Sequence, residues 1–418
     1  MASSVSSPIN FDVAIHNIVR EERGHLLSQL ITILQDINLA EDALQDAVVS
    51  ALVHWRKNGL PKIPKAWLLT TAKHKAIDRI RRDKNFHTKK DQYQFLLELQ
   101  NEDEPKESDF DIPDERLRLI FTCCHPSLDD KTSVALTLQL LGGLSINEIA
   151  KAFLLKPETM AQRLVRGKAK IRHAAIPYHI PERDVFKERL NAVLTVLYLI
   201  FNEGYSATTG KKHIRIELCH EAIRLARILY SLCPREAEVQ ALLALMLLHD
   251  ARRTARFNSQ GDFIPLEEQD RNLWNKTQIK DGTTLVQNAL KAGKIGSYKV
   301  QAAISALHSE ASSYTETKWP EIVLLYDELY KINPTPVIKL NRLVALSYVK
   351  SVKDTLIDLD ILESEFKDYQ PFYAVKADFL FRSENFIDAR SYFLMAIKLS
   401  GNLKEREFLK RRLATIPI

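Results

Sequence analysis

Hydrophobic residues in the first part of the chain recur at the three-and-four spacing that places them on one face of an α-helix. This pattern predicts helices over Asn10–Asp36, Glu41–Trp55 and Lys65–Arg82, separated by short polar or proline-containing segments. The run from Leu190 to Phe201 is apolar nearly all round, which is typical of a helix buried between other helices. We therefore expect an all-α protein.

The second half of the chain also has helical periodicity. Amphipathic helices are predicted at about 216–232, 235–253, 284–292 and 300–312, with a polar, irregular stretch from Asn258 to Gly282. Near the end, residues match the spacing of a tetratricopeptide unit, in which small residues let paired helices touch: Tyr373, Ala377, Leu380, Ala389, Phe393, Ala396 and Gly401. Parts of an earlier unit are Ile322, Tyr326, Leu329 and Pro334, and the unit between, 337–367, is degenerate. A generic helical bundle is the alternative.

Two short helices joined by a tight turn are predicted between Leu144 and Arg172. Ser145 and Glu148 have the spacing of a capping box, which satisfies free N–H groups at a helix start. Pro157 suits the first position of the second helix, where no amide donor is needed. Its core-facing line is Met160, Leu164, Gly167 and Ile171. Polar and basic residues occupy the other side: Thr159, Gln162, Arg163, Arg166 and Lys170, with Lys156 just before the helix.

This pattern favours a helix-turn-helix that enters a DNA major groove. Arg and Gln side chains can read base edges there, while Lys and Thr can hold phosphates. The alternative is an ordinary helical hairpin with a solvated basic face. Two positions depart from the motif, because Lys156 is a poor N-cap and Leu154 occupies the turn position where a glycine is often found.

Two neighbouring helices in the first segment carry opposite charge. The predicted helix 41–55 has an acidic face on its exposed side, formed by Glu41, Asp42, Gln45 and Asp46. The next helix carries a Trp among cations and hydroxyls, a composition used to bind single-stranded DNA; its candidates are Trp67, Lys73, His74, Asp78, Arg79 and Arg82. The alternatives are a solvated acidic face and a Trp67 that belongs to the core.

Composition sets limits on the class of protein. A length of 418 residues suggests two or three domains, and the net charge of +6 is modest for that size. The N-terminus lacks a signal-peptide pattern and no apolar run could cross a bilayer, so we expect a cytoplasmic protein without a membrane partner. The cysteines contain no CxxC pair and are interpreted as buried reduced thiols rather than metal ligands: Cys123, Cys124, Cys219 and Cys233.

Catalytic motifs are missing from the sequence. It contains no nucleotide-binding loop, nucleophile elbow or paired-carboxylate site. His249-Asp250, with His220, would suit an HD-type metal hydrolase, but a further His and Asp at suitable helical positions are missing. We therefore predict no enzymatic activity and no cofactor, and keep the metal hydrolase as an alternative.

Two motifs together resemble a known family. The run Leu-Ala-Glu-Asp-Ala-Leu-Gln-Asp-Ala from Leu39, followed by Pro-Lys-Ala-Trp-Leu-Leu-Thr-Thr-Ala-Lys-His-Lys-Ala-Ile-Asp-Arg-Ile-Arg-Arg from Pro64, resembles region 2 of bacterial sigma factors. The helix-turn-helix resembles their region 4. Their order and short separation are similar to those of extracytoplasmic-function sigma factors, over roughly the first 180 residues. Phe-Thr-Cys-Cys-His-Pro, Tyr-Leu-Ile-Phe-Asn-Glu-Gly-Tyr and Lys-Leu-Asn-Arg look typical of a subgroup with a C-terminal helical-repeat extension.

The resemblance implies specific partners and roles. RNA polymerase core would bind, through its beta-prime clamp helices, the residues Leu39, Glu41, Asp42, Gln45 and Asp46. Promoter DNA would be melted and read at the −10 element by the helix around Trp67 to Arg82, and recognised at the −35 element by the helix-turn-helix. The Lys-Pro-Glu-Thr sequence after the turn departs from the family pattern, which affects the expected −35 preference.

The chain then divides into four predicted parts. Residues 1–90 form region 2, 91–115 an acidic flexible linker, 116–178 region 4, and 179–418 a tetratricopeptide-like helical domain that follows the stiff Ile176–Pro181 boundary. A sigma factor regulated by this last domain, which would bind a regulatory protein or peptide, is the leading hypothesis. A helix-turn-helix regulator with a repeat domain as its sensor is the second.

Overall fold

The computed structural model describes residues 11–82, 113–153, 155–174, 176, 178–205 and 216–417. Helices form the architecture of these ranges, where we find no strand beyond an isolated bridge between Phe257 and Phe263. The all-α prediction is therefore confirmed. The chain separates into two compact units, Met1–Val196 and Leu197–Ile418. None of the described helices is long and apolar enough to cross a membrane.

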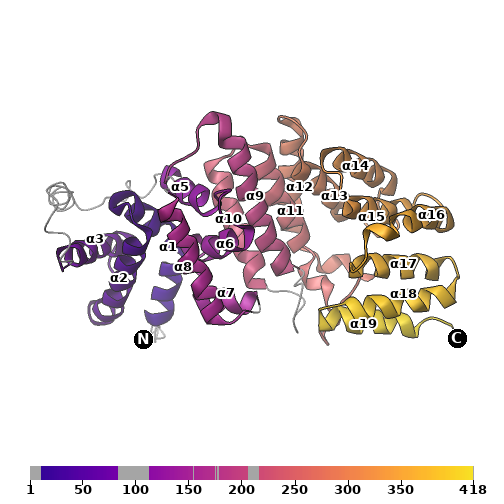
Figure 1. Ribbon diagram of the computed structural model, residues 1–418, viewed down its shortest axis with the longest axis horizontal. Coiled ribbons are helices and arrows are strands. Elements are labelled where there is room, and N and C mark those ends of the chain that lie inside the picture. Colours follow the sequence, from indigo (N-terminus) through magenta and orange to yellow (C-terminus); the bar gives the residue numbers. More distant parts are fainter. Residues whose placement is uncertain are drawn as a thin grey trace, which may run out of the picture. The chain divides into compact units, whose positions relative to one another are not determined.

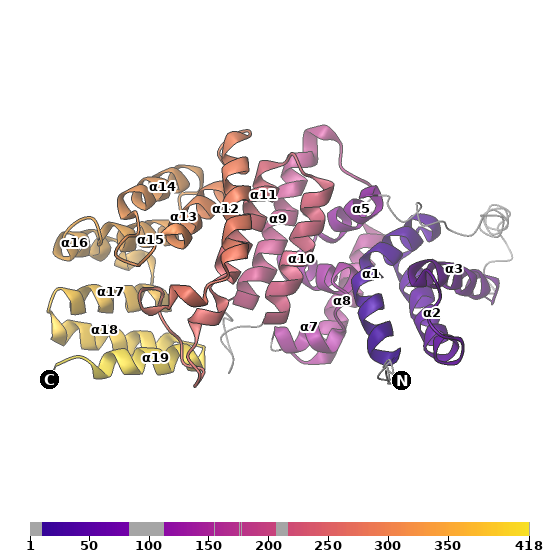
Figure 2. The same cartoon turned by 180° about the vertical axis from the view of Figure 1, so that it is seen from behind.

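The first unit begins with three helices that pack on one another (Figures 1 and 2): α1 (Phe11–Leu34), α2 (Ile37–Asn58) and α3 (Pro64–Arg82). The helix α2 begins four residues before the predicted start, because the Asp36 carboxylate accepts hydrogen bonds from the amides of Asn38 and Leu39 at 2.8 and 3.0 Å. It ends at Gly59, whose φ of 81° favours glycine.

The same unit continues, beyond residues that are not described, with short helices that support the helix-turn-helix. These are α5 (Pro113–Cys123), α6 (Asp130–Leu136) and the π-helix η3 (Thr137–Leu141). The helix-turn-helix itself consists of α7 (Ile146–Ala152) and α8 (Pro157–His173). Residues 91–112 of the predicted acidic linker lie outside the described residues. Its last three residues, 113–115, begin α5. Asp129 caps α6, since its carboxylate accepts a hydrogen bond from the Thr132 amide at 3.0 Å.

The division between the two units falls within α9 (Arg183–Tyr205). This helix contains the apolar run that was expected to be buried on most sides. Leu190, Leu197, Ile200 and Phe201 are indeed buried, whereas Leu199 is exposed. The prediction of a helix covered on several faces is therefore confirmed for most of its length.

The second unit continues with a succession of helices. They are α10 (Ile216–Leu232), α11 (Ala237–Asp250), α12 (Lys276–Lys291), α13 (Ser297–Glu310), α14 (Trp319–Ile332), α15 (Pro336–Leu346), α16 (Val352–Leu362), α17 (Gln370–Arg382), α18 (Phe386–Leu399) and α19 (Leu403–Ala414). Short 3₁₀ turns complete it: η4 (Arg253–Arg256), η5 (Leu266–Glu268), η6 (Arg271–Leu273) and η7 (Glu363–Glu365). One core joins α11, α12 and α13, and a second extends across α13 to α19.

The prediction of an irregular stretch over residues 258–282 is wrong for its last part. Residues from Lys276 onward belong to α12, where the Asn275 side chain accepts a hydrogen bond from the Gln278 amide at 3.1 Å. Gly282 lies in this helix, and a Cβ there would come within 2.8 Å of Leu248. This glycine permits a close helix crossing, although in the sequence it resembles a loop residue.

The tetratricopeptide-like spacing near the end corresponds to a packed helix pair, α17 and α18, which lie side by side in both views (Figures 1 and 2). The predicted contact residues are buried in the second core: Tyr373, Ala377, Leu380, Ala389, Phe393 and Ala396. The degenerate unit before them contains the next pair, α15 and α16.

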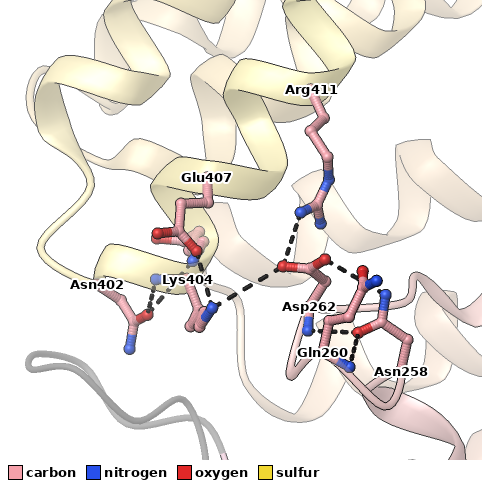
Figure 3. A network of polar contacts seen from close by, with 8 residues as sticks. Asn258, Gln260, Asp262, Asn402, Lys404, Glu407 and Arg411 are labelled. Atoms are coloured by element: carbon pink, nitrogen blue, oxygen red, sulfur yellow. Dashed lines mark hydrogen bonds and ion pairs between the residues drawn. The ribbon is translucent and has the colours of Figure 1, made fainter.

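The connector between α11 and α12 is held against the last helix (Figure 3). The Asp262 carboxylate lies 2.9 Å from the Arg411 guanidinium, and Asn258 Oδ1 accepts hydrogen bonds from the amides of Gln260 and Asp262. The rings of Phe263 and Phe408 meet edge to face at 5.4 Å. These contacts fix the part of the connector between η4 and η5 against α19.

Candidate functional site

The predicted capping box is present at the start of α7. The Glu148 amide donates to Ser145 Oγ at 3.2 Å, and the Ser145 amide donates to Glu148 Oε2 at 2.7 Å. Pro157 opens α8, and the Lys156 side chain makes no capping hydrogen bond, as its residue type predicts. The local geometry of two helices joined by a tight turn therefore follows from the residues that begin each helix.

The second of these helices, α8, has a buried line and an exposed polar face. The predicted inward residues Met160, Leu164, Gly167 and Ile171 are all buried. A Cβ on Gly167 would lie 2.6 Å from the Thr132 methyl group of α6, so glycine permits the helices to approach this closely. The predicted DNA-contacting residues that are exposed are Lys156, Thr159, Gln162, Arg166 and Lys170, while Arg163 is half-buried.

Three of these cations lie together beside a shallow groove. Arg163, Arg166 and Lys170 line a space of about 300 Å³ that Asp129 and Thr132 of the preceding segment also border. Their spacing along α8 places them on one face of the helix. This face therefore gathers three cations, with the Asp129 carboxylate at its border, in an arrangement suited to contact a phosphate backbone.

The candidate single-strand-binding helix α3 places its tryptophan between the two interpretations of the sequence, an exposed ring and a core residue. Trp67 is half-buried, its ring stacks on His54 at 5.5 Å, and it meets the edge of the fully buried Trp55 at 5.3 Å. It is therefore part of the α2–α3 interface as well as of the surface. The other predicted residues include the exposed His74, Asp78 and Arg82 and the half-buried Lys73 and Arg79.

Arg79 joins the two predicted binding faces directly. Its guanidinium donates to Asp46 at 2.9 Å and to Asp42 at 2.5 Å, and the hydrogen bond to Asp46 is the main cause that raises the Arg79 pKa. A cation assigned to DNA is thus paired with two carboxylates assigned to polymerase. The side chains of Arg79, Asp42 and Asp46 are 38%, 55% and 38% exposed, so solvent screens this cluster.

Glu41 does not lie on the exposed side of α2, contrary to the sequence prediction. Its side chain is 12% exposed and forms ion pairs with Arg23 of α1, at 3.1 Å, and with Lys168 of α8. Arg23 also donates to the Gln139 carbonyl at 3.1 Å. Burial lowers the Arg23 pKa, and the neighbouring Glu41 carboxylate opposes this shift. Glu41 therefore bridges the first three helices and the helix-turn-helix.

Further contacts join the same two parts of the first unit. The Tyr178 hydroxyl lies 3.1 Å from the Ser28 carbonyl and 3.2 Å from that of Glu115. A Cβ on Gly24 of α1 would come within 3.1 Å of the Leu141 carbonyl, which shows how closely α1 approaches η3. Gln45, a predicted polymerase contact, borders a groove of about 640 Å³ with residues at the start of α8. Region 2-like and region 4-like helices thus form one packed body.

Sequence reasoning missed Arg23 and Lys168. Lys168 is separated from Glu41 by 127 positions, and it lies on the side of α8 between the buried line and the exposed face. A charge at such an intermediate position carries no signal of its partner in a single sequence. The residues that predict each helix do not predict which helices meet.

The His249-Asp250 pair does not have the geometry of a metal site. His249 Nε2 lies 2.8 Å from the Ser305 hydroxyl, whereas Asp250 pairs with Arg253 at 3.2 Å and accepts from Gln278 at 2.9 Å. The two side chains therefore serve different neighbours, and the described residues contain no group of metal-ligating side chains. The cysteines are free and buried, as predicted, and burial raises the Cys124 pKa to about 12.

Comparison with known proteins agrees with this arrangement. Sigma-70 region 2 matches residues 18–86, sigma-70 region 4 matches 118–171, and a family of unknown function (DUF6596) matches 189–290. An uncharacterized protein of Rhizobium meliloti (strain 1021) is 36% identical over 394 residues, which cover 94% of this chain and 93% of that protein. No solved structure matches the chain significantly.

Proposed function

The chain belongs to the sigma-70 family, with regions 2 and 4 followed by a C-terminal extension as in an extracytoplasmic-function-type sigma factor, and from this premise we propose how its residues act. Sigma-70 regions 2 and 4 recognise promoters as part of RNA polymerase, so core polymerase and promoter DNA are its partners. We assign polymerase binding to Leu39, Glu41, Asp42, Gln45 and Asp46. We assign the −10 element, and assistance to its melting, to α3.

The observation that carries this proposal is the cationic face of α8. Its exposed residues are presented on a helix-turn-helix in which a capping box opens α7 and a buried line holds α8 against the core. We therefore assign −35 recognition to Lys156, Thr159, Gln162, Arg163, Arg166 and Lys170. Their side chains can reach base edges and phosphates without any change in the fold of the motif.

The test is reconstitution with core RNA polymerase and a promoter library. We expect the full chain to bind core and to initiate transcription at a defined subset of promoters. Failure to bind core, or tight binding to duplex DNA in its absence, would instead favour a self-sufficient helix-turn-helix regulator.

Substitutions in α8 separate base reading from phosphate binding. We expect Arg166→Ala or Arg163→Ala to cost about 1–3 kcal/mol at a preferred −35 sequence if the side chain makes a bidentate base contact. We expect Lys170→Ala to weaken all sequences alike and to lower the salt slope by about one. Uniform effects of every substitution across promoters would contradict the base-reading assignment.

The α3 residues are expected to act in strand opening. Alanine variants of Lys73, His74 and Arg79 should regain much of their lost activity on a promoter with a pre-melted bubble. At position 67 the variant to use in the same assay is Trp67→Phe rather than an alanine, because phenylalanine keeps an aromatic ring against Trp55. An absence of rescue on the pre-melted template would indicate a folding defect instead.

Polymerase binding also requires a change of partner at Glu41, since Lys168 and Arg23 occupy its carboxylate. We infer that region 4 leaves region 2 when core binds. Lys168→Gln should then raise the affinity for core, whereas the exposed Lys131→Gln on α6 should leave it unchanged. An unchanged affinity in Lys168→Gln would show that Glu41 stays paired within the complex.

The C-terminal extension is proposed to regulate this process, alone or with a protein or peptide partner. Covalent attachment gives it a high effective concentration near the sigma regions, so weak contacts suffice. The test compares the full chain with a truncated chain that ends at Tyr205, in transcription from the same promoters. The truncated chain keeps α9, whose Phe186 and Arg189 contact Phe121. A changed promoter output at equal core affinity would support regulation, and an equal output would contradict it.

A further inference from the structure

A pocket of about 460 Å³ in the second unit has an arginine in its wall and no acidic residue among the described residues that line it. Arg252, His249 and His308 line it, and none of the described side chains that border it is an Asp or Glu. Its volume is within the range of small-molecule sites in proteins. The region 2 and region 4 functions make no use of this pocket.

The positive charge beside the pocket comes from three arginines. Arg252 donates to the Tyr205 hydroxyl at 3.0 Å, and Arg256, which is 5% exposed, donates to the Tyr205 carbonyl at 2.6 Å. Arg271 donates to the carbonyls of His308 and Ala311 at 2.7 and 2.8 Å. Carbonyls and hydroxyls hold these guanidinium groups, and across the described ranges none of the three pairs with a carboxylate.

Aromatic rings provide the remaining contacts of these cations. The Arg256 guanidinium lies 3.7 Å from the centre of the Tyr205 ring, and that of Arg271 lies 4.4 Å from the centre of Trp274. Ring faces attract cations but do not neutralise them. The local charge excess therefore remains, and Arg252 carries it to the pocket wall.

The two histidines supply neutral polar groups. Burial, together with the charge of Arg252, lowers the His249 pKa well below its usual value and lowers the His308 pKa to about 4. At neutral pH they are uncharged and can donate or accept a hydrogen bond. The positive charge of the wall is therefore that of Arg252.

The rest of the pocket combines apolar surface with uncharged polar groups. Leu245, Ile304, Leu329 and Ile338 belong to its apolar lining. Such a lining favours a ligand with a hydrophobic body, and a guanidinium matches the two oxygens of a carboxylate. The motif from Tyr198 to Tyr205 also contributes, because Tyr198 lines the pocket and Tyr205 positions Arg252.

We propose that this pocket binds a small organic carboxylate, with the carboxylate at Arg252 and an apolar or aromatic body against Leu245, Ile304 and Leu329. The proposal concerns the second unit alone and is independent of the assignments in regions 2 and 4. It makes the C-terminal extension a receptor for a metabolite-sized anion.

Calorimetric titration of the full chain with benzoate tests the proposal, with benzamide as the neutral ligand of the same shape and sodium chloride to hold ionic strength constant. For a ligand of this size we expect a dissociation constant on the order of 1 mM or tighter. Benzamide should bind at least about tenfold more weakly, a factor that a lost charge-assisted hydrogen bond accounts for. Equal binding of the two, or of inorganic phosphate and benzoate, would overturn the proposal.

Two variants locate the site. Arg252→Gln should weaken benzoate binding by about tenfold or more, whereas Arg390→Gln, an exposed arginine on α18, should leave it unchanged. Asn341→Asp places a carboxylate at an exposed pocket position without removing any Arg252 contact, and should weaken benzoate but not benzamide. Thermal melting checks that each variant is folded. Unchanged benzoate affinity in folded Arg252→Gln and Asn341→Asp would overturn the assignment.

Discussion

Two acidic sites on α2 lie one residue apart and behave differently. Glu41 is 12% exposed and is held between Arg23 and Lys168, whereas Asp42 is 55% exposed and shares Arg79 with Asp46. In both sites a carboxylate of the predicted polymerase face meets a cation from a helix assigned to DNA. The sequence gives no sign of this difference, since both residues are acids on one helix.

The comparison shows that burial, rather than the number of ion pairs, determines what each site contributes. An exposed pair is screened by water and salt and stabilises by about 0.2–1 kcal/mol. A buried charge that loses its partner costs several times more, because it cannot regain water. The Glu41 site therefore holds two parts of the fold together, while the Arg79 site is free to exchange partners.

The largest expected effect is that of Glu41→Gln. It leaves Arg23 and Lys168 without their carboxylate, so we expect the free energy of opening in the first unit to fall by about 3 kcal/mol. Native-state hydrogen exchange of the α1 and α2 amides measures this opening. Asp42→Asn is the matched control. If it lowered the free energy of opening as much as Glu41→Gln does, the distinction between the two sites would be removed.

A double-mutant cycle gives a smaller, more specific effect. We expect Glu41→Gln and Lys168→Met to couple by about 1–3 kcal/mol, because the second substitution removes a charge that the first left unpaired. The corresponding cycle of Asp42→Asn with Arg79→Gln should couple by less than about 1 kcal/mol. Equal coupling in the two cycles, measured by the same exchange experiment, would contradict the role given to burial.

The smallest effect is the response of the exposed site to salt. Raising the ionic strength from about 0.1 to 1 M shortens the Debye length from about 10 to 3 Å. The stability difference between the wild type and Arg79→Gln, at most about 1 kcal/mol, should then shrink. The stability difference between the wild type and Glu41→Gln should change little with salt. If salt reduced it in parallel with the difference for Arg79→Gln, solvent would have to reach Glu41 freely.

Much of the local structure could be predicted from the sequence because the determinants lie close together in the chain. The capping box of Ser145 and Glu148 and the buried line of α8 require only residues within one or two helical turns. The α17–α18 pair was predictable for the same reason, since its small and large residues follow a short repeat. Gly282 was misinterpreted because a packing glycine and a loop glycine look alike until the facing Leu248 is known.

By itself the sequence determined the helical class, the helix-turn-helix with its cationic face, and the order of the sigma-like regions, since periodicity, capping and motif spacing are local properties. Only the tertiary structure decided that Glu41 is buried, that Arg79 is shared between two faces, and that Trp67 packs on Trp55. The same holds for the cations gathered around Tyr205 and Trp274. The physical reason is that burial and charge compensation depend on residues far apart in the chain, as Glu41 and Lys168 are.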